Sequence, residues 1–184
     1  MKIPQGAKRV FQGVIFDVYQ WPQKMFDGSL ATFEAFKRAD SSAVITVVGD
    51  KILIQKQEQP DSKKSYVSLP GGRNDENEDP LDGAKRELLE ETGYVSEDWE
   101  LLYTREPFYK AEWTMYYYVA RKCQYQQEPK LDGGEKITNT LISLEEFIIL
   151  SENPDFYEPD FTNFLLRLRL DPKKLEEFKN LLFK

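Results

Sequence analysis

The chain has 184 residues, which is the size of one compact domain with room for a small appendage. Hydrophobic residues make up 40% and charged residues 31%, values typical of a folded globular protein. The single cysteine, Cys123, excludes an intrachain disulfide, and the absence of histidine excludes Cys/His zinc sites and histidine-based catalytic triads. The net charge of −7 argues against binding to nucleic acid or to an anionic membrane. Because the chain has no histidine and only one cysteine, any metal must be bound by oxygen. Because it shows no secretory or membrane-spanning segment, we expect a cytoplasmic protein.

The first part of the chain is rich in strand-forming residues. Two β-branched and aromatic stretches, Val10–Trp21 and Leu30–Phe36, are separated by the turn-forming residues 26–29, which predicts an N-terminal antiparallel strand pair within residues 1–40. Ala43–Val48 and Ile52–Gln57, joined by Gly49-Asp50-Lys51, predict a hairpin. Four further strands are predicted at residues 66–69, 100–105, 114–121 and 136–142.

Helices are predicted between and after these strands. Asp79-Pro80 is a typical helix start and Gly93 a typical helix end, so residues 80–92 should be helical. Ser143 and Glu146 form a capping box for a short second helix, and two more helices are expected over residues 161–168 and after Asp171. We therefore expect an α+β fold of the α/β/α sandwich type, with a mixed β-sheet between helices, over residues 41–184.

The helix predicted over residues 80–92 carries the most informative side chains. At about 100° per residue, Glu87, Glu90 and Glu91 fall in one wedge, and Leu88 lies on the neighbouring apolar flank. Like charges at this spacing destabilise a helix by a few tenths of a kcal/mol per pair, whereas Mg²⁺ prefers such oxygen ligands. Glutamates at this spacing are also common on a solvated helix face, so the spacing alone leaves both interpretations open. Arg86, four residues before Glu90, can pair with an acid.

The segment from Gly72 to Tyr94 fits the pattern G-x5-E-x7-R-E-U-x-E-E-x-G-U, where U is a bulky apolar residue. This is the Nudix box, so the chain resembles the Nudix hydrolases, which cleave a nucleoside diphosphate linked to another moiety. The resemblance implies Mg²⁺ (or Mn²⁺) as cofactor and a small nucleotide as partner. It also implies a role for each matching residue: Glu87, Glu91 and the Gly71 carbonyl as metal ligands, Glu90 as an auxiliary ligand, Glu78 as the group that orients Arg86 and the loop, Gly93 as the helix end, and Gly72 beside the substrate.

The flanking sequences most resemble the ADP-ribose pyrophosphatase branch of that family. In that branch an N-terminal strand pair helps to form a homodimer, so the resemblance implies a homodimer that hydrolyses ADP-ribose to AMP and ribose 5-phosphate. Tyr19 and Trp21 are the candidates for stacking on the base, although aromatic residues in a strand more often form sheet core. Gln59 occupies the position of an arginine that is frequent in the branch, which removes a cation from the expected substrate site.

The catalytic base is expected on a loop beyond the box. Glu135 follows Gly133-Gly134 and aligns with the acid that acts as base or metal ligand in the pyrophosphatase branch. Glu87 and Glu90 stay alternatives, because other branches place the base within the box. Three other activities also stay open: hydrolysis of another nucleoside diphosphate sugar, hydrolysis of a nucleoside triphosphate by a sanitising enzyme, and nucleotide sensing without catalysis.

Overall fold

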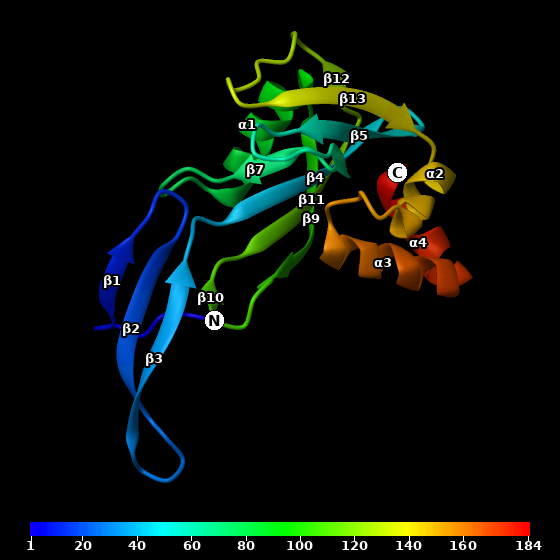
Figure 1. Ribbon diagram of the computed structural model, residues 1–184. Helices are drawn as coiled ribbons and strands as arrows, with labels where there is room; N and C mark the ends of the chain where they lie inside the picture. The colour runs from blue at the N-terminus through cyan, green and yellow to red at the C-terminus, as the bar shows by residue number, and fades with distance from the viewer.

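A mixed β-sheet forms the centre of the protein in a computed structural model that describes residues 1–184 (Figure 1). Its seven strands are β4 (Ser41–Val48), β5 (Lys51–Glu58), β6 (Tyr66–Ser68), β7 (Gly71–Arg73), β9 (Asp98–Arg105), β11 (Met115–Arg121) and β13 (Lys136–Ile142). The order is β13-β5-β4-β11-β9, with β6 beside β5 and β7 beside β4. Only β4 and β11 are parallel, so the sheet is mixed, as predicted.

Helices cover both faces of this sheet. Helix α1 (Pro80–Thr92) packs on one face, and α2 (Leu144–Ile149), α3 (Pro159–Leu170) and α4 (Pro172–Leu182) pack on the other (Figure 1). Strand β4 serves both layers, because Val44 contacts the α1 side whereas Ile45 and Val47 join the core beneath α2 to α4. This arrangement confirms the predicted α+β sandwich. No helix is both long and apolar enough to cross a membrane.

The predicted helix ends are confirmed by their capping contacts. Asp79 accepts a hydrogen bond from the Leu81 backbone N–H at 2.9 Å, and Gly93 ends α1 in the left-handed conformation with φ 73°. The capping box of α2 is present, and Asp171 caps α4. The start of α1 is thus fixed by local sequence alone.

The N-terminal region forms a second sheet of β1 (Lys8–Gln12), β2 (Asp17–Lys24), β3 (Leu30–Lys37) and β10 (Ala111–Glu112). The prediction of one strand over Val10–Trp21 was wrong, because a turn closed by the Gly13 N–H and the Phe16 carbonyl (3.0 Å) separates β1 from β2. Val14 in this turn is 95% exposed. The turn residues are strand-forming types, so composition could not reveal the turn.

Two segments connect the N-terminal sheet to the central one. Strand β3 continues into β4 through residues 38–40, and β10 continues into β11 through residues 113–114. The connections are bonded to each other, with the Arg38 N–H donating to the Glu112 carbonyl (3.3 Å) and the Ser41 N–H to the Thr114 carbonyl (3.0 Å). Sequence analysis missed β10 and also the two-stranded pair of β8 (Tyr94–Val95) and β12 (Gln124–Tyr125). The division of the chain near residue 40 remains a prediction.

Candidate active site

Helix α1 presents its three glutamates to three different environments. Leu88 is fully buried against the sheet and fixes the rotation of the helix. As a result Glu91 is 4% exposed, and the side chains of Glu87 and Glu90 are 15% and 44% exposed. The wedge expected from the sequence is present, but its acids are buried to different degrees.

Arg86 joins the loop before α1 to the acids on the helix. Its Nε and Nη2 atoms donate to the two carboxylate oxygens of Glu78 at 3.0 and 3.1 Å, a bidentate pair. Its Nη1 atom donates to Glu87 Oε1 (2.9 Å) and Glu90 Oε2 (3.1 Å). Glu78 in turn accepts the Asp75 backbone N–H at 2.8 Å. Glu78 therefore holds both Arg86 and the loop, and the Arg86 hydrogen bond lowers the pKa of Glu78.

Two glycines allow the backbone to approach these acids closely. A Cβ atom at Gly72 would lie 2.7 Å from the Glu87 carboxylate, so any side chain there would displace it. Gly71 has φ 143° and runs so close to β4 that a Cβ would lie 2.1 Å from the Ser42 carbonyl oxygen. Burial raises the pKa of Glu87, and the Arg86 contact partly offsets this. The glycine turn is thus built around the Glu87 carboxylate.

Glu91 ends a chain of buried hydrogen bonds. Its Oε2 atom accepts from the Gly71 backbone N–H at 2.8 Å and from Gln55 Nε2 at 3.1 Å. Gln55 accepts from Gln57 Nε2 (2.8 Å), and Gln57 accepts from the Tyr66 hydroxyl (2.9 Å). Burial raises the pKa of Glu91 to about 8 despite these donors. This series of hydrogen bonds holds Oε2 of Glu91 in place and does not include Oε1.

Sequence analysis did not identify Gln55 and Gln57. Strand alternation turns Leu53, Gln55 and Gln57 to the same side, and all three are buried. An inward-facing strand position is normally apolar, so two glutamines at such positions were the sequence signal that could have identified them as site residues. Asn139 of β13 adds a further contact, donating through Nδ2 to the Glu91 carbonyl at 2.9 Å.

The donor set fits a hard divalent cation. The groups near the glycine turn are carboxylates and peptide oxygens, and the only thiol, Cys123, is buried beneath α1 elsewhere. No group of three or more acidic or thiol side chains is arranged around a metal position, because Glu87 and Glu90 turn to Arg86 and Glu91 turns to Gln55. Metal binding would therefore require Glu87 and Glu90 to loosen their contacts with Arg86.

Glu135 lies on the loop before β13, near the same acids. Its charge adds to burial in raising the pKa of Glu87 and of Glu91. Within the loop its Oε2 atom accepts the Asp132 backbone N–H at 3.1 Å. The structure thus brings Glu135 near the box, bonded to its own loop rather than to α1.

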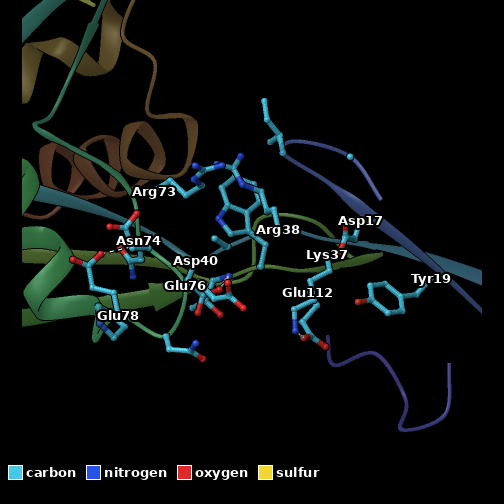
Figure 2. A pocket seen from close by; sticks show the side chains of 18 of the residues that line it. Asp17, Tyr19, Lys37, Arg38, Asp40, Arg73, Asn74, Glu76, Glu78 and Glu112 are labelled. Carbon is cyan, nitrogen blue, oxygen red and sulfur yellow. Dashed lines mark hydrogen bonds and ion pairs between the residues drawn. The ribbon is translucent and has the colours of Figure 1, made fainter. Parts of the chain in front are cut away.

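A cleft of about 1040 Å³ separates the N-terminal sheet from the loop before α1, and Figure 2 shows its lining. Tyr19 lines this cleft. Trp21 does not: it is 8% exposed and packs against Phe33 with ring centroids 6.2 Å apart. Gln59 instead lines a second cleft of about 450 Å³, together with Tyr66. The predicted substrate residues are therefore divided between two clefts and a buried position.

Residues 37–163, more than half of the chain, match the NUDIX domain family. The chain belongs to the Nudix family. Over 158 residues this Nudix protein is 27% identical to the ADP-ribose pyrophosphatase of Bacillus subtilis (strain 168), covering 83% of this chain and 84% of the relative. Over 156 residues it is 26% identical to the methanol dehydrogenase activator of Bacillus methanolicus, with the same two coverages.

Solved structures support the Nudix fold. A crystal structure of an ADP compounds hydrolase matches with a TM-score of 0.74 at 21% identity, covering 91% of this chain and 93% of that chain. A structure of MutT, from a study of Aliivibrio salmonicida and Vibrio cholerae, matches with a TM-score of 0.52 at 19% identity, covering 70% and 96%. With its complete Nudix box, the protein is a Nudix hydrolase.

Proposed function

We propose that this Nudix hydrolase cleaves the diphosphate bond of ADP-ribose and releases AMP and ribose 5-phosphate. The observation that carries the proposal is the intact set of acids around the glycine turn, with Glu87 against Gly72 and Glu91 against Gly71. The likeness to an ADP-ribose pyrophosphatase over most of both chains supports ADP-ribose as the substrate.

Glu87 and Glu91, with Glu90 as an auxiliary ligand and the Gly71 carbonyl, would hold Mg²⁺ or Mn²⁺. The chemistry that such a cation supplies is neutralisation of the diphosphate charge and a lower pKa for a bound water. Arg86 orients Glu87 and Glu90 until the cation is bound, and Glu78 keeps Arg86 in reach. Both residues are thus positioning groups.

The proton of the attacking water goes to the carboxylate of Glu135. The water oxygen forms a bond to phosphorus as the bridging P–O bond breaks, and the leaving phosphate keeps that bond's electron pair. We assign this role to Glu135 because it lies near the box acids and its carboxylate is hydrogen-bonded within its own loop, to the Asp132 N–H. Its loop, with Gly133 and Gly134, can move toward the substrate.

The base of the nucleotide stacks on Tyr19 in the large cleft. We assign this contact to Tyr19 rather than to Trp21 because Trp21 is 8% exposed. Because Gly72 has no side chain, the substrate can approach Glu87. Gln59 contacts the substrate from the second cleft.

The N-terminal sheet forms a homodimer interface. Phe11, Val14, Phe26 and Leu30 are 59%, 95%, 112% and 71% exposed, which is a large apolar surface for an isolated chain. A second copy of the same sheet is the proposed partner, because two-fold homodimers are the commonest protein oligomers.

A substrate panel with Mg²⁺ tests the proposed activity. ADP-ribose, other nucleoside diphosphate sugars and oxidised dGTP are compared, and AMP should form fastest from ADP-ribose. Glu91→Gln should lower turnover by orders of magnitude, whereas the exposed control Glu97→Gln should not. An undiminished rate after exhaustive chelation would refute the cation assignment, and faster hydrolysis of another substrate would refute ADP-ribose.

A further inference from the structure

Two arginines converge in the large cleft without an acidic partner. Arg73 pairs across the β4–β7 ladder with Ser41, three residues after Arg38, which brings the two guanidinium groups together (Figure 2). Neither forms an ion pair within 4.0 Å, whereas Arg9 and Lys37 in the same cleft pair with Asp17 and Glu112. Two adjacent like charges are unfavourable unless a counter-charge joins them.

Aromatic rings hold Arg38 in this position. Its guanidinium carbon lies 4.3 Å from the centroid of the Trp113 ring and 5.7 Å from that of Phe16. Its Nε atom is buried and has no hydrogen-bond partner, and its only side-chain contact to oxygen is Ser41 Oγ at 3.4 Å. A buried N–H without a partner is costly, so the Arg38 guanidinium lacks the acceptors that such a group normally has inside a protein.

The pair lies directly beside the candidate active site. The Arg73 carbonyl accepts from Arg86 Nη2 at 3.2 Å, and the preceding residue, Gly72, touches the Glu87 carboxylate. Glu78, which holds Arg86, also lines the large cleft, so the arginine pair and the box acids are joined by one loop. Planar guanidinium groups bind phosphate oxygens with two parallel hydrogen bonds.

We propose that Arg38 and Arg73 bind a phosphate group of the nucleotide directly, without a metal ion between them. The identity of the ligand as a nucleotide rests on the proposed function. Its negative charge does not, because that is inferred from the two arginines alone. Arg38 is the fixed half of the site, because Trp113 and Phe16 orient it. Arg73 is exposed and is the half that closes on the phosphate.

A metal-free titration tests the site separately from catalysis. Pyrophosphate is added in excess EDTA while tryptophan fluorescence is recorded, because Trp113 contacts Arg38. The wild-type protein should show saturable binding, and Arg73→Gln should weaken it about 10- to 100-fold, the worth of one charge-assisted hydrogen bond. Lys24→Gln removes an exposed cation outside the cleft and should leave binding unchanged. Equal affinities of wild type and Arg73→Gln would overturn the proposal.

Steady-state kinetics give the second readout. With ADP-ribose and saturating Mg²⁺, Arg73→Gln should raise KM by about 10- to 100-fold while kcat and the Mg²⁺ concentration for half-maximal rate change less than about threefold. Arg73→Lys keeps the charge and should recover part of the affinity. An unchanged KM would contradict the phosphate contact. If no nucleotide were hydrolysed, the proposed function would fail, and the pyrophosphate titration would still decide whether the anion site exists.

Discussion

Glu158→Gln should make the protein more stable at alkaline pH and leave its stability nearly unchanged at acid pH. Glu158 directly precedes α3, on the face of the sheet opposite α1. Burial, reinforced by the charge of Asp160, raises its pKa to about 7, although the Tyr117 hydroxyl donates to it at 3.2 Å and the Leu69 backbone N–H also favours the charged form. The wild-type carboxylate therefore ionises at a cost in the folded state.

The sign follows from the two pKa values of this carboxyl group. In the unfolded chain it ionises near its ordinary value of 4.5, and in the folded protein near about 7. Below the lower value both states are protonated and there is no penalty. As pH rises through this window the folded state binds more protons than the unfolded one, so the free energy of unfolding falls until the loss is complete above about pH 7.

The size of the loss can be bounded. The interval from 4.5 to about 7, at about 1.4 kcal/mol per pH unit, is worth about 3 kcal/mol. The positive end of α3 favours the charged form by about 0.3–1 kcal/mol, which leaves about 2–3 kcal/mol. Glutamine cannot ionise and avoids this penalty.

Urea unfolding at about pH 5 and about pH 8 measures the effect, as the difference between variant and wild type at each pH. Glu91 also has a raised pKa, but it titrates in both proteins and cancels in that difference. The expected result is a gain of about 2–3 kcal/mol at the higher pH that largely disappears at the lower one. The exposed control Glu97→Gln should show no such change with pH. A Glu158→Gln effect that is equal at both pH values would refute the reasoning.

Three more changes test the candidate site and the N-terminal sheet. Glu135→Gln should lower kcat by about 100-fold or more with Mg²⁺ affinity within a few-fold; a loss of both would make Glu135 a ligand, and an unchanged rate would place the base in the box. Gln55→Leu should weaken Mn²⁺ binding, measured by paramagnetic resonance without substrate, by about 10- to 100-fold because Glu91 loses a positioning donor, and an unchanged affinity would refute that role. Removing residues 1–38 should give an unstable or aggregating monomer in sedimentation, whereas a soluble, fully active truncation that sediments like the intact protein would contradict the dimer.

Much of the fold could be predicted because its signals are local. Asp79, Pro80 and Gly93 act within one turn of the helix they bound, so the ends of α1 could be predicted from short segments. The hairpin around Gly49 depends on φ 61° at that residue, which is also a local requirement. The spacing of the box acids likewise follows from helix geometry.

The features that sequence analysis missed depend on contacts between distant residues. Gln55 acts on Glu91 across 36 positions, and Arg73 meets Arg38 only because β7 pairs with β4. No local pattern encodes such pairings. The burial of Trp21 is similar, since its aromatic side chain suits either a stacking surface or a sheet core, and packing against Phe33 decides.

The doubled connection between the two sheets has a mechanical consequence. Because β3 with β10 and β4 with β11 run side by side in parallel, with cross-bonds at Arg38 and Ser41, one two-stranded ribbon passes through both sheets. A single linker can rotate about its backbone dihedrals, but a hydrogen-bonded ribbon can only bend and twist as a unit. We therefore expect the curvature of this ribbon to set the width of the large cleft. If nucleotides bind in this cleft as proposed, we expect their selection to depend on whether a molecule fits a gap of fixed size, with the loop of Glu135 supplying the movement.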